Sequence, residues 1–310
     1  MEYNGLVSVV MPVHNGEKYL REAIESVLNQ TYTNFEFLII ENCSTDSSVE
    51  IIKSYNDHRI RLIIENNCGQ VQAYNRGFKE AKGEYVFIHD HDDISHPERF
   101  EKQLKNMIKN NIEICGSYFS LIDENKKIIG EIEVPIKHDA IVKELLYRNS
   151  TIFNSSVCIN KKVFMRLENF NIKYFPSADY EFYLRGVGLF VYGNIPEFLY
   201  SWRQHPKQIS SSYIKEVASK TIAISLMYKN KFPANKINTY TGLVYYYNDK
   251  LLKSFGYFFI ALFLDKFTKK LLRYFLIVCF AGVPLKLIRK FNLVNSKLFL
   301  TSKKAFNKVL

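Results

Sequence analysis

The first part of the chain alternates between short apolar stretches and longer segments in which apolar residues recur at helical spacing. Four stretches have the length and composition of buried strands, and three segments carry their apolar residues on one side of a helix. The strands cover residues 6–11, 35–40, 59–64 and 85–88, and the helices cover 17–30, 46–52 and 71–81. This alternation predicts a parallel sheet with right-handed crossovers.

Beyond residue 110 the alternation weakens, and the pattern becomes that of a mixed α+β fold. Helical patterns cover 97–110, 139–147 and 179–184, and strand-like stretches cover 112–119, 128–134, 190–192 and 198–202. A shift in composition near Ser212 predicts a boundary there. We expect one α/β unit over residues 1–212 and a helical region over 213–310.

Three carboxylates follow the last strand of the first half. The run Y-V-F-I-H-D-H-D-D places Asp90, Asp92 and Asp93 directly after this strand, with no Lys or Arg among them. Side chains of an extended segment alternate between faces, so Asp90 and Asp92 project the same way beyond the strand's carboxyl end. Open α/β sheets bind ligands at that edge. Two hard oxygen ligands at this spacing suit Mg²⁺ or Mn²⁺, which keeps its other positions for water and phosphate oxygens.

The alternative for these carboxylates is an acidic turn that caps the next helix, whose start Ser95 and Pro97 indicate. A cap needs only one carboxylate, and neighbouring carboxylates repel one another. We therefore favour the cation site over the cap.

Bulk composition indicates a globular chain, and the N-terminal residues do not resemble a secretion signal. Hydrophobic residues make up 47% and charged residues 24% of the 310 positions. The five cysteines are odd in number and widely scattered, so we expect no disulfide framework and a reducing cytosol. Cys115 and Cys158 lie in apolar strands and are predicted to be inert core residues. The N-terminus lacks the basic and apolar regions of a secretion signal.

The net charge of +11 is concentrated at the C-terminal end. Residues 265–310 hold eleven Lys or Arg and one acidic residue, a net charge of +10 that calls for an anionic partner. The longest uncharged runs there, 254–264 and 274–285, are too short to span a bilayer as a helix, which takes about 20 residues.

A basic face lies opposite an apolar stripe in the last part of this tail. Leu287, Phe291, Val294 and Leu298 share one helical stripe, and Lys286, Arg289, Lys290 and Lys297 lie mostly off it. This pattern is typical of a helix that lies in the membrane interface, so we expect an anionic membrane surface as partner. The alternative is a soluble helical appendage. Nucleic acid is disfavoured because no aromatic platform or known reading motif accompanies the charge.

Five motifs occur in order along the first two thirds of the chain. They are V-S-V-V-M-P-V-H-N-G, I-I-E-N-C-S-T-D-S-S, N-R-G-F-K-E-A-K-G-E-Y-V-F-I-H-D-H-D-D, A-D-Y-E-F-Y-L-R and W-R-Q-H-P-K-Q-I-S. In order and spacing they resemble the inverting glycosyltransferases of family 2, over about residues 6–212. The resemblance implies the A-type glycosyltransferase fold, a Rossmann-like, mainly parallel sheet flanked by helices. It also implies a nucleotide-binding half at about 1–110 and an acceptor half at about 111–212.

The resemblance assigns nucleotide contacts to the first two strand ends. Pro12, Val13 and His14 lie where the family's first strand touches the base, although His14 could equally be an ordinary loop histidine. Glu41 stands where the family usually has an aspartate that binds the base, so uracil is favoured and thymine or guanine stays open.

Further positions match the family near the diphosphate and the metal. Asn75 falls on a family Asn, but Tyr74 stands where many members have Arg. Asp92 matches the direct metal ligand, and Asp90 the carboxylate that contacts ribose or a metal-bound water. Asp93 is expected to orient the loop or to reach the sugar. The late segment with Arg203 and His205 matches one that lies near the diphosphate.

The resemblance implies that Asp179 is the general base. Inverting transfer requires one carboxylate to take the acceptor hydroxyl's proton as its oxygen attacks the anomeric carbon. The family's Glu-Asp pair appears here as Ala178-Asp179, and Glu181 is the candidate to replace the missing Glu. A helix N-cap is the alternative role for Asp179, and both can hold together.

We therefore expect a metal-dependent, inverting glycosyltransferase, cytoplasmic and peripheral on the inner face of the cell membrane. It would transfer a single hexosyl or N-acetylhexosaminyl group, with UDP-sugar favoured as donor, to a growing glycan or lipid-linked acceptor. The resemblance suggests bacterial surface-polysaccharide biosynthesis. Two alternatives stay open: a non-catalytic membrane scaffold that binds nucleotide or glycan, supported by the departures at Glu41, Tyr74 and Ala178, and a sugar nucleotidyltransferase that uses the same carboxylates.

Overall fold

The computed structural model describes residues 3–146, 151–206 and 208–228. The chain separates into two compact units, residues 1–206 and 207–310. Every strand of the described residues belongs to the first unit. In the second unit, the described residues form the helices α8 (Ile209–Ser212) and α9 (Ile214–Met227).

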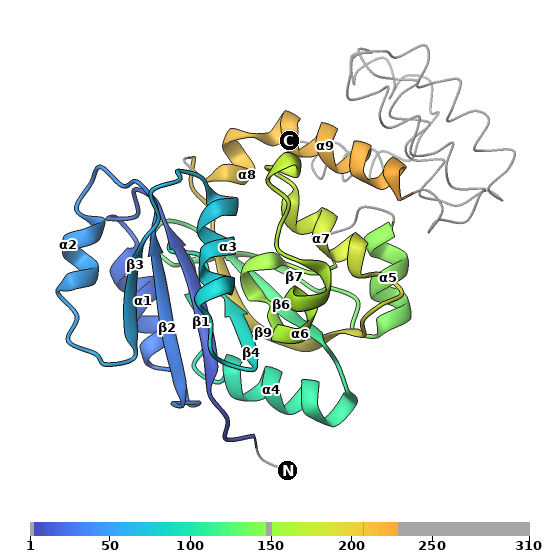
Figure 1. The fold of residues 1–310 in the computed structure, drawn as a ribbon, viewed down its shortest axis with the longest axis horizontal. Coiled ribbons are helices and arrows are strands. Elements are labelled where there is room, and N and C mark those ends of the chain that lie inside the picture. Colours follow the sequence, from blue (N-terminus) through green and yellow to red (C-terminus); the bar gives the residue numbers. More distant parts are fainter. Residues whose placement is uncertain (1–2, 147–150, 207, 229–310) are drawn as a thin grey trace, which may run out of the picture. The chain divides into compact units, whose positions relative to one another are not determined.

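The first half of the first unit alternates between strands and helices, as the hydrophobic pattern predicts (Figure 1). Its elements are β1 (Val7–Val13), α1 (Leu20–Leu28), β2 (Phe35–Glu41), α2 (Ser48–Lys53), β3 (Ile60–Ile64), α3 (Gln70–Glu80) and β4 (Tyr85–Ile88). β1 pairs in parallel with β2 and with β4, and β2 pairs in parallel with β3. The predicted parallel arrangement is confirmed for these strands.

The second half continues the same sheet with mixed strand directions. Its elements are β5 (Ile94–Ser95), α4 (Arg99–Asn110), β6 (Ile114–Ile122), β7 (Ile128–Ile132), α5 (His138–Leu146), the 3-10 turn η1 (Asn154–Ser156), β8 (Cys158–Asn160), α6 (Lys161–Leu167), the 3-10 turn η2 (Ile172–Tyr174), α7 (Ala178–Gly186) and β9 (Tyr192–Arg203). The strand order is β3-β2-β1-β4-β8-β6-β9-β5, with β7 beside β6. The predicted mixed α/β fold is confirmed.

One prediction about the strands is wrong: Tyr192, at the end of the stretch 190–192, and the stretch 198–202 belong to a single long strand, β9. Pro196 interrupts the apolar pattern, but the strand continues because the register with β6 shifts there, from Ser117↔Ile195 to Tyr118↔Phe198. A proline has no N–H to donate to a regular ladder, but it is tolerated at such a bulge because the bulged residue is left unpaired. β5, with two residues, is too short for a periodic pattern to indicate.

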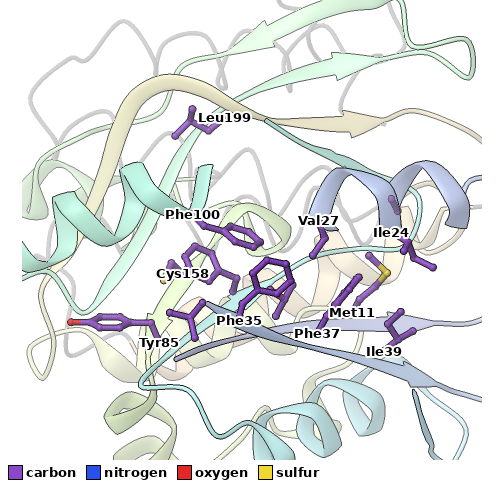
Figure 2. Close-up of a cluster of buried hydrophobic side chains, with 14 of the residues drawn as sticks. Met11, Ile24, Val27, Phe35, Phe37, Ile39, Tyr85, Phe100, Cys158 and Leu199 are labelled. Atoms are coloured by element: carbon purple, nitrogen blue, oxygen red, sulfur yellow. The ribbon is translucent and has the colours of Figure 1, made fainter. Parts of the chain in front are cut away.

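The core of the first half lies between the sheet and three helices. Alternate residues of β1 face α1, α2 and α4, and Figure 2 shows Met11, Phe37 and Ile39 of the strands packed with Ile24 and Val27 of α1. α3 covers the opposite face of the sheet. A Cβ at Gly77 of α3 would lie 2.3 Å from Val10, so only glycine allows this approach.

The carboxyl ends of β1, β2 and β4 meet at one edge of the sheet. Val13 lies opposite Glu41 in the register between β1 and β2, and Val10 lies opposite Ile88 in the register between β1 and β4. The residues that follow these strands, from His14, Asn42 and His89 onward, therefore emerge side by side.

The expectation that no disulfide forms is wrong. Cys43, after β2, is bonded to Cys68, before α3, with their Cα atoms 5.7 Å apart. The pairing could not be read from spacing, because it depends on the loops after β2 and β3 meeting at the sheet edge. The Asn42 side chain links the same loops, donating to the carbonyls of Glu65 and Asn67. Cys115 and Cys158 are buried thiols, as predicted, and burial raises the pKa of Cys115 to about 12.

No helix within residues 3–146, 151–206 and 208–228 combines the length and hydrophobicity needed to cross a membrane. The predicted apolar runs at 254–264 and 274–285 and the basic stripe from Leu285 onward lie outside the described residues. The predicted tail helix therefore stays a prediction. The predicted boundary at Ser212, which is the last residue of α8, stays a prediction as well.

Reduction of the Cys43–Cys68 bond is expected to lower the free energy of unfolding by about 3 kcal/mol, because the bond closes a loop across 25 positions. Denaturant unfolding with and without dithiothreitol measures this. The Cys43→Ser, Cys68→Ser variant should be insensitive to the reductant. Alkylation of Cys43 and Cys68 in unreduced, denatured protein would contradict the bond.

Candidate active site

Asp90, Asp92 and Asp93, hereafter the acidic cluster, follow the carboxyl end of β4. Each offers a carboxylate oxygen, and these oxygens lie within 4.8 Å of one another. The backbone turns sharply here, with the N–H of Asp93 donating to the carbonyl of Asp90 at 3.5 Å. The sequence prediction that these carboxylates converge is thus met in the structure.

The carboxylate of Asp90 accepts hydrogen bonds from two hydroxyl groups. The Tyr74 hydroxyl of α3 donates to Oδ1, and the Ser155 hydroxyl of η1 donates to Oδ2. Its backbone N–H donates to the Tyr200 hydroxyl of β9 at 3.2 Å. Burial and the charge of Asp92 raise the pKa of Asp90, while the two hydroxyl groups oppose that shift.

The carboxylate of Asp92 is paired with His205, which follows β9. His205 Nε2 lies 2.9 Å from Asp92 Oδ2, and its ring lies 5.2 Å from the ring of Tyr19. Burial opposes ionisation of Asp92, but this hydrogen bond and the nearby histidines hold its pKa below the ordinary value. Asp92 is therefore the member of the cluster best kept as a carboxylate.

Asp93 is the most buried member of the cluster, with 1% of its surface exposed. Its Oδ1 accepts the backbone N–H of Arg203 at 2.8 Å, and its Oδ2 has no hydrogen-bond partner among the described residues. Burial and the charges of Asp92 and Asp90 raise its pKa well above the ordinary value. An orphaned buried oxygen beside two mutually repelling carboxylates fits a divalent cation, which would relieve the repulsion.

Arg203 holds the loop of the acidic cluster in place through hydrogen bonds to three elements. Its buried guanidinium donates to the carbonyl of Asp92 at 2.8 Å, to the carbonyl of Glu124 at 3.0 Å and to the carboxylate of Glu22 at 2.6 Å. It also lies over the ring of Tyr19. Its N–H groups thus hold β9, α1 and the β6–β7 turn around the cluster, and its predicted diphosphate contact stays a prediction.

The predicted base-binding residues come together at the ends of β1 and β2. Glu41 is buried, and its Oε1 accepts the N–H of Ser44 at 2.6 Å. The exposed His14 ring is hydrogen-bonded through Nδ1 to the carbonyl of Asn42 at 2.8 Å. Pro12 and Val13 are the last two residues of β1, and the Pro12 carbonyl lies 3.2 Å from Nδ1 of His91.

Asn75 connects α3 to the segment that precedes α7. Its side-chain amide donates to the carbonyl of Phe170 at 2.8 Å and accepts the N–H of Phe170 at 3.0 Å. Both polar ends of the amide are therefore engaged with the acceptor half. The predicted nucleotide contact of Asn75 stays a prediction.

Asp179 lies half-buried in the first turn of α7, where Ser177 is the N-cap. Burial raises the pKa of Asp179 to about 6, the backbone N–H groups of the turn oppose that rise, and the charge of Asp90 adds to it. The two carboxylates are therefore within electrostatic range. A carboxylate with this pKa accepts a proton more readily than an ordinary aspartate, as a general base must.

Glu181, the candidate to replace the missing Glu, is paired with Arg185 on the same helix at 3.0 Å. The side chain of Ala178, at the position of that Glu, is buried. α7 therefore presents Asp179 without a second carboxylate at the family position.

Sequence reasoning missed the residues that hold the acidic cluster from other elements. Ser155 and Tyr200 are distant in sequence from the cluster, and the pairing of β4 with β8, and of β5 with β9, brings their elements to it. Glu22 of α1 is linked to the cluster through Arg203, whose guanidinium donates to the Glu22 carboxylate. His89 is fully buried and its Nδ1 lies 2.7 Å from the carbonyl of Asp90. Burial lowers the pKa of His89 to about 3, so its ring stays neutral. One signal of such a contact is present in the sequence: Tyr74, which stands where many family members have Arg, donates its hydroxyl to Asp90.

Comparisons with known proteins agree with this geometry. The model of the family "Glycosyl transferase family 2" matches residues 8–171. An uncharacterized glycosyltransferase of Haemophilus influenzae is 32% identical over 317 residues, which cover 94% of this chain and 98% of that protein. The O-antigen biosynthesis glycosyltransferase WbnJ of Escherichia coli is 29% identical over 255 residues, covering 80% of this chain and 97% of WbnJ.

Two solved structures show a similar fold at low sequence identity. TarS residues 1–349 of S. aureus, in complex with UDP-GlcNAc, superposes with a TM-score of 0.59 at 16% identity, covering 88% of this chain and 79% of TarS. The mannosyltransferase PcManGT from Pyrobaculum calidifontis, in complex with GDP-Man and Mn2+, superposes with a TM-score of 0.57 at 14% identity, covering 98% and 81%. With the family match over more than half of its length, the chain belongs to glycosyltransferase family 2 and has the A-type glycosyltransferase fold.

Proposed function

We propose that this glycosyltransferase moves a single sugar, with inversion, from a nucleotide-diphosphate donor to a hydroxyl of a growing glycan or lipid-linked acceptor. UDP-sugar is the favoured donor, and cell-surface polysaccharide is the favoured product. The observation that carries the proposal is the acidic cluster, whose carboxylate oxygens lie within 4.8 Å of one another at the carboxyl end of β4. Asp179, whose pKa burial raises to about 6, is the proposed general base. The likeness to WbnJ, named for O-antigen biosynthesis, supports the product class.

The acidic cluster is the proposed site for Mn²⁺ or Mg²⁺. Asp92 and Asp90 would hold the cation, and when bound it supplies positive charge beside the phosphates of the leaving group. The presence of Mn2+ in the PcManGT structure supports the assignment. Asp92, with its lowered pKa, is the ligand ready to bind without losing a proton.

Asp179 acts as the general base in this proposal. Its carboxylate takes the proton of the acceptor hydroxyl while the hydroxyl oxygen forms a bond to the anomeric carbon. The bond from that carbon to the diphosphate breaks on the opposite face, and its electron pair leaves with the nucleoside diphosphate. Attack from the opposite face inverts the anomeric configuration.

The nucleotide lies at the ends of β1 and β2 in this proposal. Pro12, Val13 and His14 would contact the base from one side, and Glu41 would recognise its ring N–H. The diphosphate would lie toward Asn75, Arg203 and His205, and Asp93 would orient the loop or reach the sugar. TarS with UDP-GlcNAc and PcManGT with GDP-Man have the same fold, so the base specificity rests on the side chains at these strand ends.

The site of action is proposed to be the cytoplasmic face of a membrane. The support is the charge of +10 over residues 265–310, together with the basic and apolar stripes from Leu285 onward. A lipid-linked acceptor would then be presented to the enzyme at the same surface.

Asp92→Ala and Asp179→Asn are each expected to lower the transfer rate by about a hundredfold or more, because one removes a metal ligand and the other the base. The measurement is nucleoside diphosphate release from UDP-, GDP- and dTDP-sugars with membrane extract as acceptor, with Mn²⁺ or with chelator. Glu50→Gln, at an exposed position of α2, should leave the rate unchanged. Pyrophosphate as product would indicate a nucleotidyltransferase, and absence of any turnover would favour the scaffold.

The rate should rise with pH through about 6, because Asp179 must be deprotonated to accept a proton and its pKa is about 6. Below that pH, kcat/KM should fall tenfold per pH unit. The measurement is kcat/KM between pH 4.5 and 8 for wild type and for Asp179→Asn, whose residual rate should lack this limb. An acid limb near pH 6 that survives in Asp179→Asn would assign it to another group.

Replacing the basic face of the tail should release the full-length protein from anionic vesicles. Four cations become glutamine in this variant: Lys286, Arg289, Lys290 and Lys297. Each surface cation contributes about 1 kcal/mol, so affinity for phosphatidylglycerol vesicles should fall at least about a hundredfold in a sedimentation assay. A control variant replaces four exposed lysines of the first unit: Lys53, Lys79, Lys105 and Lys109. Equal loss in both variants would show nonspecific charge attraction only.

A further inference from the structure

An aromatic cluster lies on one face of the pair formed by β6 and β9. Phe119 lies opposite Tyr200 in the register, and Leu121 lies opposite Trp202. Phe119 and Tyr200 are buried, whereas Phe153 and Trp202 are partly exposed at the rim of the same cluster. The rings of Phe153 and Trp202 lie 5.0 Å apart, and Phe153 stacks on Phe119 at 4.3 Å. We call Phe153 and Trp202 the aromatic rim.

The aromatic rim adjoins the acidic cluster. Phe153 directly precedes η1, whose Ser155 donates to the Asp90 carboxylate. Trp202 lies two residues after Tyr200, whose hydroxyl accepts the N–H of Asp90. Tyr200 and Trp202 share a face of β9, while Arg203 extends from the other face to Glu22 of α1. The rim therefore lies on the side of Ser155 and the Asp90 carboxylate.

The rim also adjoins the helix that carries the proposed base. The Tyr183 hydroxyl of α7 donates to Oδ1 of Asn154 at 2.7 Å, so α7 is fastened to the residue that follows Phe153. In the strand order, the base-binding ends of β1 and β2 lie on one side of β4, and β6 and β9 lie on the other. A donor bound at β1, β2 and the acidic cluster would leave the β6–β9 side for the acceptor.

The chemistry of Trp202 suits a sugar ring. Its ring face is apolar, and no hydrogen bond among the described residues uses its indole N–H. A pyranose presents an apolar C–H face and hydroxyl groups at its edge, so it can stack on the ring and accept from the N–H.

We propose that Phe153 and Trp202 form a stacking subsite for a pyranose ring of the acceptor, beside the acidic cluster. The inference rests on the proposed function, because it assigns the acceptor side of that same site. It identifies the substrate class there as carbohydrate, and it makes Trp202 a specificity-determining residue for the acceptor.

Trp202 is the only tryptophan in the chain, so its fluorescence reports on this subsite without turnover. The full-length protein is titrated with the methyl α- and β-pyranosides of glucose, galactose, mannose and N-acetylglucosamine, up to high millimolar concentration. Saturable change in emission with at least one glycoside is expected, and Phe153→Leu should weaken it. No change with any glycoside would overturn the subsite.

The kinetic test uses the donor that the release assay identifies, with the best glycoside of the titration as acceptor. Trp202→Leu should raise the acceptor KM about tenfold, which corresponds to one lost stacking contact. Donor KM and acceptor-independent donor hydrolysis should stay within twofold, and Trp202→Tyr should restore most of the affinity. An unchanged acceptor KM in Trp202→Leu would overturn the proposal.

A control variant distinguishes the loss of stacking at Trp202 from a general destabilisation of the sheet by the loss of an aromatic ring from β9. Phe198→Leu removes a partly buried ring of the same strand that packs on Tyr118 at 5.4 Å, four residues before Trp202. It should leave acceptor KM unchanged, and an equal rise in both variants would overturn the stacking role. Nucleoside diphosphate release with membrane extract as acceptor distinguishes the two levels of failure. Release with an unchanged acceptor KM in Trp202→Leu rejects the subsite alone, whereas no release from any donor rejects the proposed transfer.

Discussion

The mutual repulsion of three neighbouring carboxylates is the constraint around which the first unit is arranged. Each is held by a donor from a different part of the chain: Asp90 by Tyr74 and Ser155, Asp92 by His205, and Asp93 by the backbone N–H of Arg203. Hydrogen bonds to buried charges are among the stronger polar contacts, because the alternative is an unsatisfied charge away from water. α3, η1 and β9 are thereby fastened to the end of β4.

The sheet topology makes this arrangement possible. β4 lies between β1 and β8 in the strand order, so its carboxyl end lies where the parallel half of the sheet meets the antiparallel strands. On one side lie the proposed base-binding residues, and on the other lie η1, α7 and β9. A site that joins two substrates needs groups from both sides of one point, and the change of strand direction at β4 supplies them.

The positions that depart from the family have physical counterparts in the structure. Tyr74 replaces an arginine but donates its hydroxyl to Asp90, so a neutral hydrogen bond stands where a cation would be. Glu41 is one methylene longer than aspartate, and its Oε1 accepts the N–H of Ser44 within its own loop. The pKa of Asp179 is raised although no Glu precedes it, because burial is the largest cause of the shift.

The hydrophobic pattern by itself determined the strands and helices of the first half, because burial on a sheet or a helix imposes periods that a single segment displays. The run of carboxylates after β4 likewise indicated the acidic cluster, because its members lie within four positions of the sequence. Tertiary structure alone decided what is distant in sequence: the Cys43–Cys68 bond, the hydroxyl of Ser155 at Asp90, the engagement of Arg203, and the continuity of β9 past Pro196. These depend on which loops and strands meet in space, and no local period encodes that meeting.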